Sequence, residues 1–564
     1  MQKLIQMKAT EYTLKFLILL TLVVLVNLGM RHQIFRLDMT EEKRYSVNDA
    51  TISMLQNLDE PIYVEVYLAG DINAEFMRLQ TAIKQTLEQF KTYAYGNLQY
   101  SFTNPDEATS ANARNEFYRY LVDKGIQPTT VFDNAEGKKS QKLIFPGAEI
   151  SYGGRSMPVI LLNGNNSAGA SQAITQSIEN LEYELASSIK SLSSSKRKRI
   201  ALFQGNGSPS GDDVKGLVET ISTKYDLSPV QNTARLKNYD AAIFLKPTED
   251  FSNAELYDID QFIMNGGKSL FFLDGLIMDV DSIKEFGAMA LPVETGLDDL
   301  LFKYGVRVNN DILQDVNSGN FPIVTGNLGK DPQIQLLPWP YYIILNKYAN
   351  HPIVRNMNAV YGKFVSSIDT VAANGIKKTP LIFTSDYTRK LNGPIHINFE
   401  TLKDEMKPEN FNLKNVPVTY LLEGEFTSVY QNRLPPKGKE TAKRKDSSSE
   451  NSIIVASDGD LLLSEINKKN NQPFPLGVDP YANHPSNFAN DQLIINMLNY
   501  MLDEDGLIIS RSKDLKIRPL DKIKVAEDRV WLQLVNVALP IILIVMFGVL
   551  RHYWRSRKYS KFND

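Results

Sequence analysis

Two long apolar runs stand near the ends of the chain, at residues 14–30 and 531–550, and none of comparable length lies between them. A hydrocarbon core of roughly 30 Å needs about 20 helical residues. Each run therefore predicts a transmembrane helix. The pattern predicts a two-pass membrane protein in which everything between the two helices lies on one side of the bilayer.

The first run allows a second interpretation, a cleaved signal peptide, because basic residues precede it. Residues 26–30 offer no small-residue cleavage site, so we expect an uncleaved anchor. The second run contains Asn536 and Pro540. An asparagine amide in lipid lacks partners, and a proline frees a backbone carbonyl about one turn earlier. We expect a helix–helix contact at these two positions; the alternative is that Asn536 hydrates near the interface.

Charge near the two apolar runs predicts the orientation of the chain. The tail at 1–13 carries lysines, and the tail at 551–564 is strongly basic. Lysine and arginine accumulate on the cytoplasmic side of membrane helices. We therefore expect both termini in the cytoplasm, the basic tail near anionic membrane lipid, and the large domain in the periplasm of a bacterial inner membrane.

The region 40–193 alternates strand-like and helix-like patterns in the order β-α-β-α-β-β, followed by a long helix. This order suggests a thioredoxin-like α/β domain. The segment 194–198 is polar and basic and predicts a linker. The alternative interpretation of its basic run, a nucleic-acid patch, is the weaker one, because the net charge of the whole chain is −3.

A second α/β domain is predicted at 199–505. Buried strand patterns alternate there with helical patterns, which favours a parallel sheet. The pattern weakens from 285 to 435, where no fold is predicted. A polar stretch at 436–451 predicts a disordered loop. Residues 506–530 then form a juxtamembrane segment.

The composition excludes several kinds of functional site. The chain has no cysteine, which excludes disulfides, thiolate metal sites and a cysteine nucleophile. The five histidines share no metal-ligand spacing. No catalytic residue, no cofactor site and no metal site is predicted.

One loop deserves a functional hypothesis. The sequence GNGSPSG at 205–211 follows a predicted buried strand and precedes a helix. It is neither a Walker A loop nor a dinucleotide fingerprint, and it lacks G-x-S-x-G. Loops at the carboxyl ends of parallel strands bind ligands in open α/β sheets. Three readings stay open: a structural loop, a ligand-contacting loop and, least favoured, a catalytic Ser208. The candidate contact residues are Gly205, Asn206, Gly207 and Ser208.

Three further motifs have structural interpretations. We expect turn and cap roles for Asp274, Asp279 and Asp281, and an Asx-type turn for the segment 457–460. The aromatic segment LPWPYY at 337–342 predicts a packed loop; the alternative is a platform for a sugar or peptide.

The chain resembles the GldG family, the gliding-motility-associated ABC transporter proteins of Bacteroidota. The resemblance rests on residues 45–71, the segment FMRLQTAIKQTLEQF after them, the blocks at 457–467, 473–481 and 488–525, and the terminal membrane helix. It implies a complex with a separate permease subunit and a cytoplasmic ABC ATPase, linked to gliding and its associated secretion system. It also implies a central glutamine-amidotransferase-like (flavodoxin-like) domain without the nucleophile.

These observations give one leading hypothesis and two rivals. The leading one is a non-enzymatic accessory subunit whose periplasmic domains bind or scaffold envelope and motility components. Without a Walker motif, ATP hydrolysis must come from a partner, and two membrane helices are too few for a transport pathway. The first rival is a membrane-tethered receptor for a solute, glycan or peptide. The second is an envelope hydrolase that uses Ser208.

Overall fold

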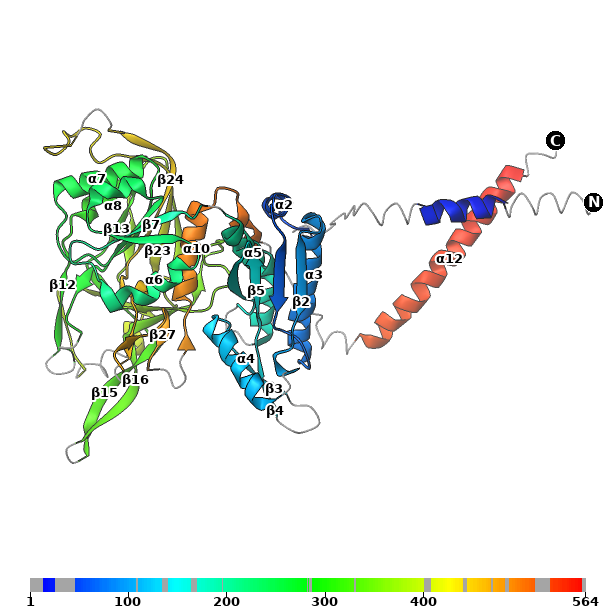
Figure 1. Cartoon of the computed structure of the whole chain (residues 1–564), viewed down its shortest axis with the longest axis horizontal. Helices are drawn as coiled ribbons and strands as arrows, with labels where there is room; N and C mark the ends of the chain where they lie inside the picture. Colours follow the sequence, from blue (N-terminus) through cyan, green and yellow to red (C-terminus); the bar gives the residue numbers. More distant parts are fainter. Residues whose placement is uncertain are drawn as a thin grey trace, which may run out of the picture. The chain divides into compact units, whose positions relative to one another are not determined.

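The protein is described here by a computed structural model. It covers residues 14–25, 46–107, 110–133, 140–163, 170–194, 196–280, 283, 287–328, 331–399, 407–439, 444–467, 470–481, 486–512 and 528–559. The chain forms two compact units, one up to residue 513 and one from residue 514 onward. Figure 1 shows the elements in sequence colours. Within the first unit we distinguish an N-terminal subdomain, residues 46–194, and a central subdomain, residues 199–502.

The N-terminal subdomain is a four-stranded sheet in the order β2-β1-β5-β6. β1 and β2 run parallel, whereas β5 is antiparallel to both β1 and β6. A separate hairpin joins β3 to β4. The strands are β1 (Ile62–Val66), β2 (Leu98–Phe102), β3 (Thr129–Asp133), β4 (Ser140–Ile144), β5 (Gly147–Tyr152) and β6 (Arg155–Ile160). The helices are α2 (Asp49–Gln56), α3 (Ala74–Tyr93), α4 (Ala111–Asp123) and α5 (Ala170–Ser193).

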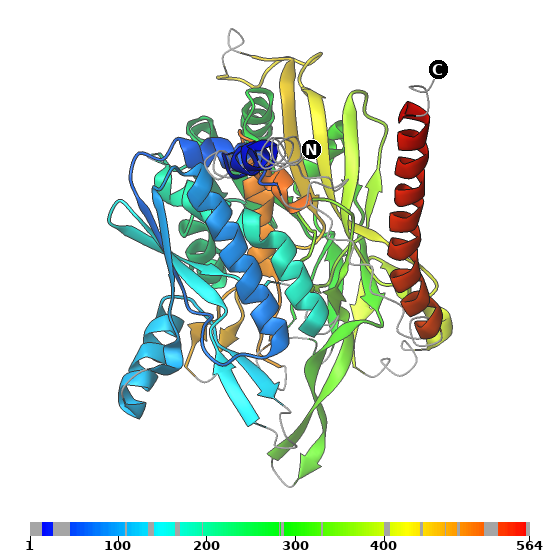
Figure 2. The same cartoon turned by 90° about the vertical axis from the view of Figure 1, so that its right-hand side faces the viewer.

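Helical spacing of apolar residues builds this core. The buried residues of α3 recur every three or four positions from Phe76 to Phe90 and form one stripe along the helix. Asn73 caps the first turn by accepting from the Phe76 N–H at 3.0 Å. α3 and α5 pack against each other, as Figure 2 shows. The segment 142–154 contributes to two strands, because β4 ends at Ile144 and β5 begins at Gly147, with Phe145 and Pro146 between them.

The central subdomain contains an eight-stranded mixed sheet in the order β17-β20-β23-β24-β10-β9-β7-β8. Five neighbours, from β24 to β8, run parallel. The other three continue the sheet antiparallel, so the predicted parallel sheet is correct for only part of it. The strands are β7 (Arg199–Phe203), β8 (Asp226–Val230), β9 (Ala241–Leu245), β10 (Lys268–Phe272), β17 (Lys347–Tyr348), β20 (Ile376–Phe383), β23 (Pro417–Thr427) and β24 (Ser447–Ala456).

Helices cover both faces of the parallel part of this sheet. α6 (Lys215–Ser222) and α10 (Asn490–Leu502) share one hydrophobic core with alternate strand residues. α7 (Asn253–Met264) and α8 (Leu297–Tyr304) share a second core with the other strand residues. Both faces are buried, which explains why these strands are continuous apolar runs. In sequence order the five parallel strands are arranged 2-1-3-4-5, the order of flavodoxin-like sheets.

The region without a predicted fold supplies β17, β20 and β23 to the eight-stranded sheet. Its other strands form small sheets, several of them around a fourth, aromatic-rich core. In Figure 1 the β15–β16 hairpin extends away from the central sheet. The strands are β11 (Leu276–Ile277), β12 (Ala288–Pro292), β13 (Val306–Val308), β14 (Asp311–Asp315), β15 (Ser318–Leu328), β16 (Asp331–Leu345), β18 (Val360–Lys363), β19 (Ile368–Thr370), β21 (Thr388–Asn392) and β22 (Ile395–Ile397). Four two-residue strands follow β24: β25 (Ile466–Asn467), β26 (Gln472–Pro473), β27 (Val478–Asp479) and β28 (Ser486–Asn487).

Two loop predictions were wrong. The polar residues 447–451, expected in a disordered loop, belong to β24 and pair with β23, for example Glu450 with Glu425; residues 440–443 lie outside the described part of the chain. LPWPYY lies within β16. Its prolines stand at an irregularity of the β15–β16 ladder, between the pairs Asn320–Pro338 and Ser318–Ile343. Proline is tolerated there because fewer backbone N–H donors are needed.

The C-terminal end of the described chain has two parts. η10 (Leu507–Ser512), in the predicted juxtamembrane segment, packs against α5 of the N-terminal subdomain. α12 (Arg529–Tyr559) includes the predicted span 531–550. Among the described residues, Arg529–Arg557 is the one helix long and apolar enough to cross a membrane, and the apolar helix Leu14–Leu25 is shorter. Residues 26–30 of the first predicted span lie outside the described residues.

Candidate functional site

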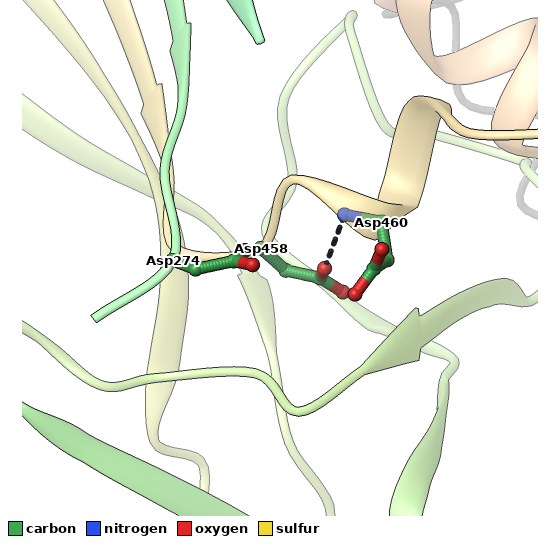
Figure 3. Close-up of side chains that lie close together, drawn as sticks. All are labelled: Asp274, Asp458 and Asp460. Carbon is green, nitrogen blue, oxygen red and sulfur yellow. Dashed lines mark hydrogen bonds between the residues drawn. The ribbon is translucent and has the colours of Figure 1, made fainter. Parts of the chain in front are cut away.

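Charged residues gather where three adjacent parallel strands end. Lys246 directly follows β9, Asp274 lies two residues after β10, and Asp458 and Asp460 follow β24. Because β24, β10 and β9 are parallel neighbours, their carboxyl ends lie along the same sheet edge. Figure 3 shows the three aspartates close together. We call these four residues the carboxylate cluster.

One ammonium group holds the cluster together. Lys246 Nζ lies 2.9 Å from Asp274 Oδ2 and 2.7 Å from Asp460 Oδ1. The side chains are largely buried, with exposed fractions of 22% for Lys246, 7% for Asp274 and 16% for Asp460. Burial by itself would lower the pKa of Lys246, but the two carboxylates more than offset it, so this pKa is raised. The lysine therefore stays charged and serves as the internal counterion of the cluster.

Backbone N–H groups fix the remaining carboxylate oxygens. Asp458 accepts from the Lys363 N–H at 2.8 Å and from the Asp460 N–H at 2.7 Å. The second bond is the predicted Asx-type turn. Asp274 accepts from the Gly459 N–H at 2.6 Å. A Cβ on Gly459 would stand 2.6 Å from Lys246 Cβ, so glycine permits this close approach.

Negative charge is in excess within the cluster, and the titration of the acids reflects it. Burial raises the pKa of Asp274, although Lys246 opposes the shift. Burial also raises the pKa of Asp458 well above its usual value, with the charges of Asp460 and Asp274 acting in the same direction. Neighbouring carboxylates cannot all ionise without mutual repulsion. Asp274 and Asp458 thus hold protons more tightly than isolated aspartates do.

A pocket of about 360 Å³ opens on this cluster. Its size lies in the range of small-molecule sites, roughly 300–1,000 Å³. Its aromatic walls come from Phe321, Tyr342, Phe364 and Tyr481. Its charged groups are Lys246, Asp274, Lys363, Asp460 and Glu465. We call it the sheet-edge pocket.

Lys363 lies in an aromatic and acidic environment within this pocket. It forms an ion pair with Glu465, and its Nζ stands 5.1 Å from the ring centroid of Tyr342 and 5.8 Å from that of Tyr361. Burial lowers the pKa of Lys363, although Asp460 and Asp458 counteract the shift. Positive charge over aromatic faces is stabilising, so this lysine is held within the pocket wall.

The pocket suits reversible binding. Charges of both signs can orient a polar ligand, and aromatic walls can cover its apolar part. The three aspartates each offer one oxygen within 4.8 Å of the others. Lys246 already neutralises two of them, so a cation would have to displace its ammonium group. We therefore treat the acidic cluster as an ion-pair network rather than as a metal site.

The predicted loop at 205–208 lies at the same edge of the sheet, after β7, but does not line the sheet-edge pocket. Asn206 O accepts the N–H groups of Thr248 at 2.9 Å and Glu249 at 3.0 Å. Gly207 has φ +73°, and a Cβ there would stand 2.0 Å from the Thr248 hydroxyl. The loop therefore braces the connection after β9. Among the described residues, the buried Ser208 hydroxyl has no hydrogen-bond partner.

The remaining predicted positions are more scattered. Asn536 and Pro540 both lie in α12, where Asn536 is exposed. Asp279 is exposed in the segment 276–280, and Asp281 lies outside the described residues. Besides their expected turn roles, Asp274 and Asp458 share a role in the carboxylate cluster. The signal that could have revealed it is that Lys246, Asp274 and Asp458 each lie one or two residues after a buried strand.

Comparisons with known proteins add family relationships. Residues 197–497 match a family model described as an ABC-type uncharacterized transport system, and residues 41–151 match a domain of unknown function. An uncharacterized protein of Borreliella burgdorferi is 21% identical over 558 residues, which span 96% of this chain and 97% of that protein. A solved structure, the mmIFT52 N-terminal domain, matches over 54% of this chain and 98% of its own length, with 14% identity and a TM-score of 0.31. That score is too low to relate the two folds.

Proposed function

Because the chain belongs to the family of ABC-type uncharacterized transport systems, we propose that it is a non-enzymatic accessory subunit of an ABC-type membrane complex. The single observation that carries this proposal is the extent of the family match. It begins in the linker before β7 and ends within α10, so it includes the mixed sheet, the carboxylate cluster and the sheet-edge pocket.

The proposal assigns a different function to each subunit of the complex. A permease subunit and a cytoplasmic ABC ATPase supply the transport pathway and the hydrolysis of ATP. This chain supplies a large domain between two membrane anchors, with both termini cytoplasmic and the domain periplasmic. The apolar part of α12 and the basic residues that follow this part, from Arg551 onward, support this topology. The resemblance to the GldG family extends the proposal to gliding motility and its associated secretion system.

Co-purification tests the proposal. The full chain, tagged at its C-terminus and extracted in mild detergent, should bring down an ABC permease and an ABC ATPase in fixed ratio. Recovery of the chain without any ABC subunit, even after cross-linking in intact cells, would contradict it. For the topology, protease added to spheroplasts should digest the large domain and spare a short terminal tag.

Substitutions at Asn536 make the co-purification experiment more specific. We propose that its amide contacts another helix, because an exposed asparagine in α12 would otherwise face lipid. Such contacts are worth roughly 0.6–2 kcal/mol, or about threefold to thirtyfold in association. Asn536→Leu should lower permease recovery, and Asn536→Gln should retain it. Equal recovery with both variants would exclude the contact.

The sheet-edge pocket favours a second candidate function, a tethered receptor for a solute, glycan or peptide. Its volume of about 360 Å³ and its mixture of aromatic and charged walls are the supporting observations. Screening the full chain against small solutes, glycan fragments and peptides would test this function. A true ligand should lose affinity with Tyr342→Ala but not with a substitution of the exposed Lys237.

A further inference from the structure

A second cavity, of about 320 Å³, lies at the junction of the N-terminal and central subdomains. α5 contributes one wall, the linker at 196–198 a second, and Lys224 and Tyr225 after α6, with the segment 499–508, the others. We call it the junction pocket. Its volume also falls in the range of small-molecule sites, roughly 300–1,000 Å³.

Five cationic side chains and three acidic ones line the junction pocket, so positive charge is in excess. The cations are Lys190, Lys196, Arg197, Lys198 and Lys224. The acids are Asp503, Glu504 and Asp505. The acids are already engaged by two of the lysines: Lys190 Nζ lies 3.4 Å from Asp503 and 2.6 Å from Asp505, and Lys198 pairs with Glu504.

Three of these cations, Lys196, Arg197 and Lys224, have no acidic partner among the described residues, and Lys224 is the one of the three that is not exposed. Its Nζ donates to the Ser187 hydroxyl at 3.1 Å, and within the described residues no carboxylate lies within 4.0 Å of it. Burial lowers the pKa of Lys224; Glu184 counteracts this shift, whereas Arg511 adds to it. The lysine therefore bears the cost of desolvation without the ion pair that would offset it.

A second buried cation strengthens this imbalance. Arg511 in η10 is wholly buried. One of its nitrogens donates to the Arg355 carbonyl at 2.8 Å, whereas Nε and Nη1 have no partner in the described part of the chain. Its guanidinium stands 5.3 Å from the ring centroid of Tyr183, a residue that lines the junction pocket. Burial lowers the pKa of both Lys224 and Arg511, and Glu184 opposes the shift at both. A further negative charge would offset the cost of desolvation that remains.

We propose that the junction pocket binds a phosphate-bearing ligand, with Lys224 as the central cation. Lysine is a point-charge binder of phosphate, and a doubly charged phosphate monoester would neutralise the excess charge. The cavity has room for a phosphate and a small organic substituent. The same chemistry is offered by a soluble phosphate ester and by the headgroup of an anionic lipid. This inference does not depend on the proposed function.

Occupancy of the junction pocket would change how the two subdomains are joined. Ser187 and Lys190 belong to α5 of the N-terminal subdomain, and Lys224 follows α6 of the central subdomain. An anion between them would attract both sides. Its binding would therefore stabilise the junction by mass action, in proportion to its affinity for the folded state.

The test uses the full chain in nanodiscs of phosphatidylcholine. Sodium phosphate and glycerol 3-phosphate are the soluble probes, at constant ionic strength, and nanodiscs containing phosphatidylglycerol are the lipid arm. Mass spectrometry measures the rate at which an amine-reactive reagent acylates Lys224. The midpoint of thermal unfolding is measured in the same samples. Soluble probes that slow acylation and raise the midpoint identify a phosphate ester; protection in the lipid arm alone identifies a headgroup. Absence of protection in every arm overturns the proposal.

Matched variants separate binding from folding. Lys224→Met should weaken the response to the effective probe at least tenfold, yet leave the midpoint without ligand equal to or above that of the wild type, because an unpaired buried charge has been removed. Lys224→Arg should retain the response. Lys215→Met, at an exposed position of α6, should respond as the wild type does. Equal responses of Lys224→Met and Lys215→Met would refute the assignment.

Discussion

The replacement Lys246→Met tests the role of the ammonium group in the carboxylate cluster. Methionine keeps most of the apolar stem and removes the charge. At an effective dielectric constant of about 20, two unit charges 4 Å apart interact by about 4 kcal/mol, and Lys246 makes two such contacts, at 2.9 and 2.7 Å. Burial of the ammonium group offsets several kcal/mol of this attraction.

The expected net loss follows from the burial of the three side chains. Removing one partner of a fully buried ion pair costs about 3–5 kcal/mol, whereas exposed pairs are worth about 0.2–1 kcal/mol. With exposed fractions of 22%, 7% and 16%, the cluster lies nearer the buried limit. We expect Lys246→Met to lower the free energy of unfolding by about 2–4 kcal/mol.

The loss should also depend on pH. Without Lys246, the negative charge of Asp460 acts on Asp274 with no counterion between them, which raises the folded-state pKa of Asp274 further above the unfolded value. The folded state then binds more protons than the unfolded state between those two pKa values, so stability falls as pH rises through this window. The destabilisation should be smaller at pH 5 than at pH 8.

Urea unfolding measures both effects. Trp339 is almost fully buried in the central subdomain, so its fluorescence reports unfolding once Trp531 and Trp554 are replaced by phenylalanine. Lys237→Met, at an exposed position, is the control for loss of a lysine charge. Adding Asp460→Asn to Lys246→Met should recover part of the stability. A loss below about 0.5 kcal/mol, the ordinary range for surface substitutions, or one independent of pH, would refute the reasoning.

Three further predictions concern packing and activity. Asn490→Leu should destabilise the central subdomain by about 3 kcal/mol, because the side chain donates to the carbonyls of Tyr361 and Leu461, both at 2.9 Å, and leaves them unpaired when removed; the same urea assay measures it. Gly216→Ala should cost about 1–3 kcal/mol by overpacking, since a Cβ would stand 2.6 Å from the Ser464 hydroxyl; a neutral result would show that the site relaxes. The purified chain, free of partners, should hydrolyse no ATP above a detergent blank, because G-x-x-x-x-G-K-[ST] is absent.

The sequence predicts best the elements whose pattern depends on local periodicity. The apolar runs RIALF, AAIFL and SLFF correspond to β7, β9 and most of β10, because strands buried on both faces are continuously apolar. The antiparallel extension by β23 and β20 was not predicted, since its pairing joins segments far apart in the chain. LPWPYY shows the same limit: its prolines indicate a loop unless the irregularity in the β15–β16 pairing is known.

The candidate site was predicted even less completely, for the same reason. Lys246 and Asp460 stand 2.7 Å apart in space but are separated in the chain by most of the central subdomain. Only the strand order brings them together. Each residue taken alone is an ordinary polar residue at the end of a strand. The junction pocket could not be predicted for the same reason. Its cations and acids come from the basic run 196–198 and from three other segments that are distant in the chain.

The packing of η10 on α5 has a consequence for biosynthesis. Leu507 and Ile508 are buried in the same hydrophobic core as Val47 and Leu55, near the beginning of the described N-terminal subdomain. A ribosome therefore completes the central subdomain before it supplies the last apolar side chains that the earlier subdomain requires. Contacts so distant in sequence form late, because a long loop must close first. Nascent chains that stop short of residue 507 would leave part of the N-terminal core open, a surface suited to capture by chaperones until synthesis supplies η10.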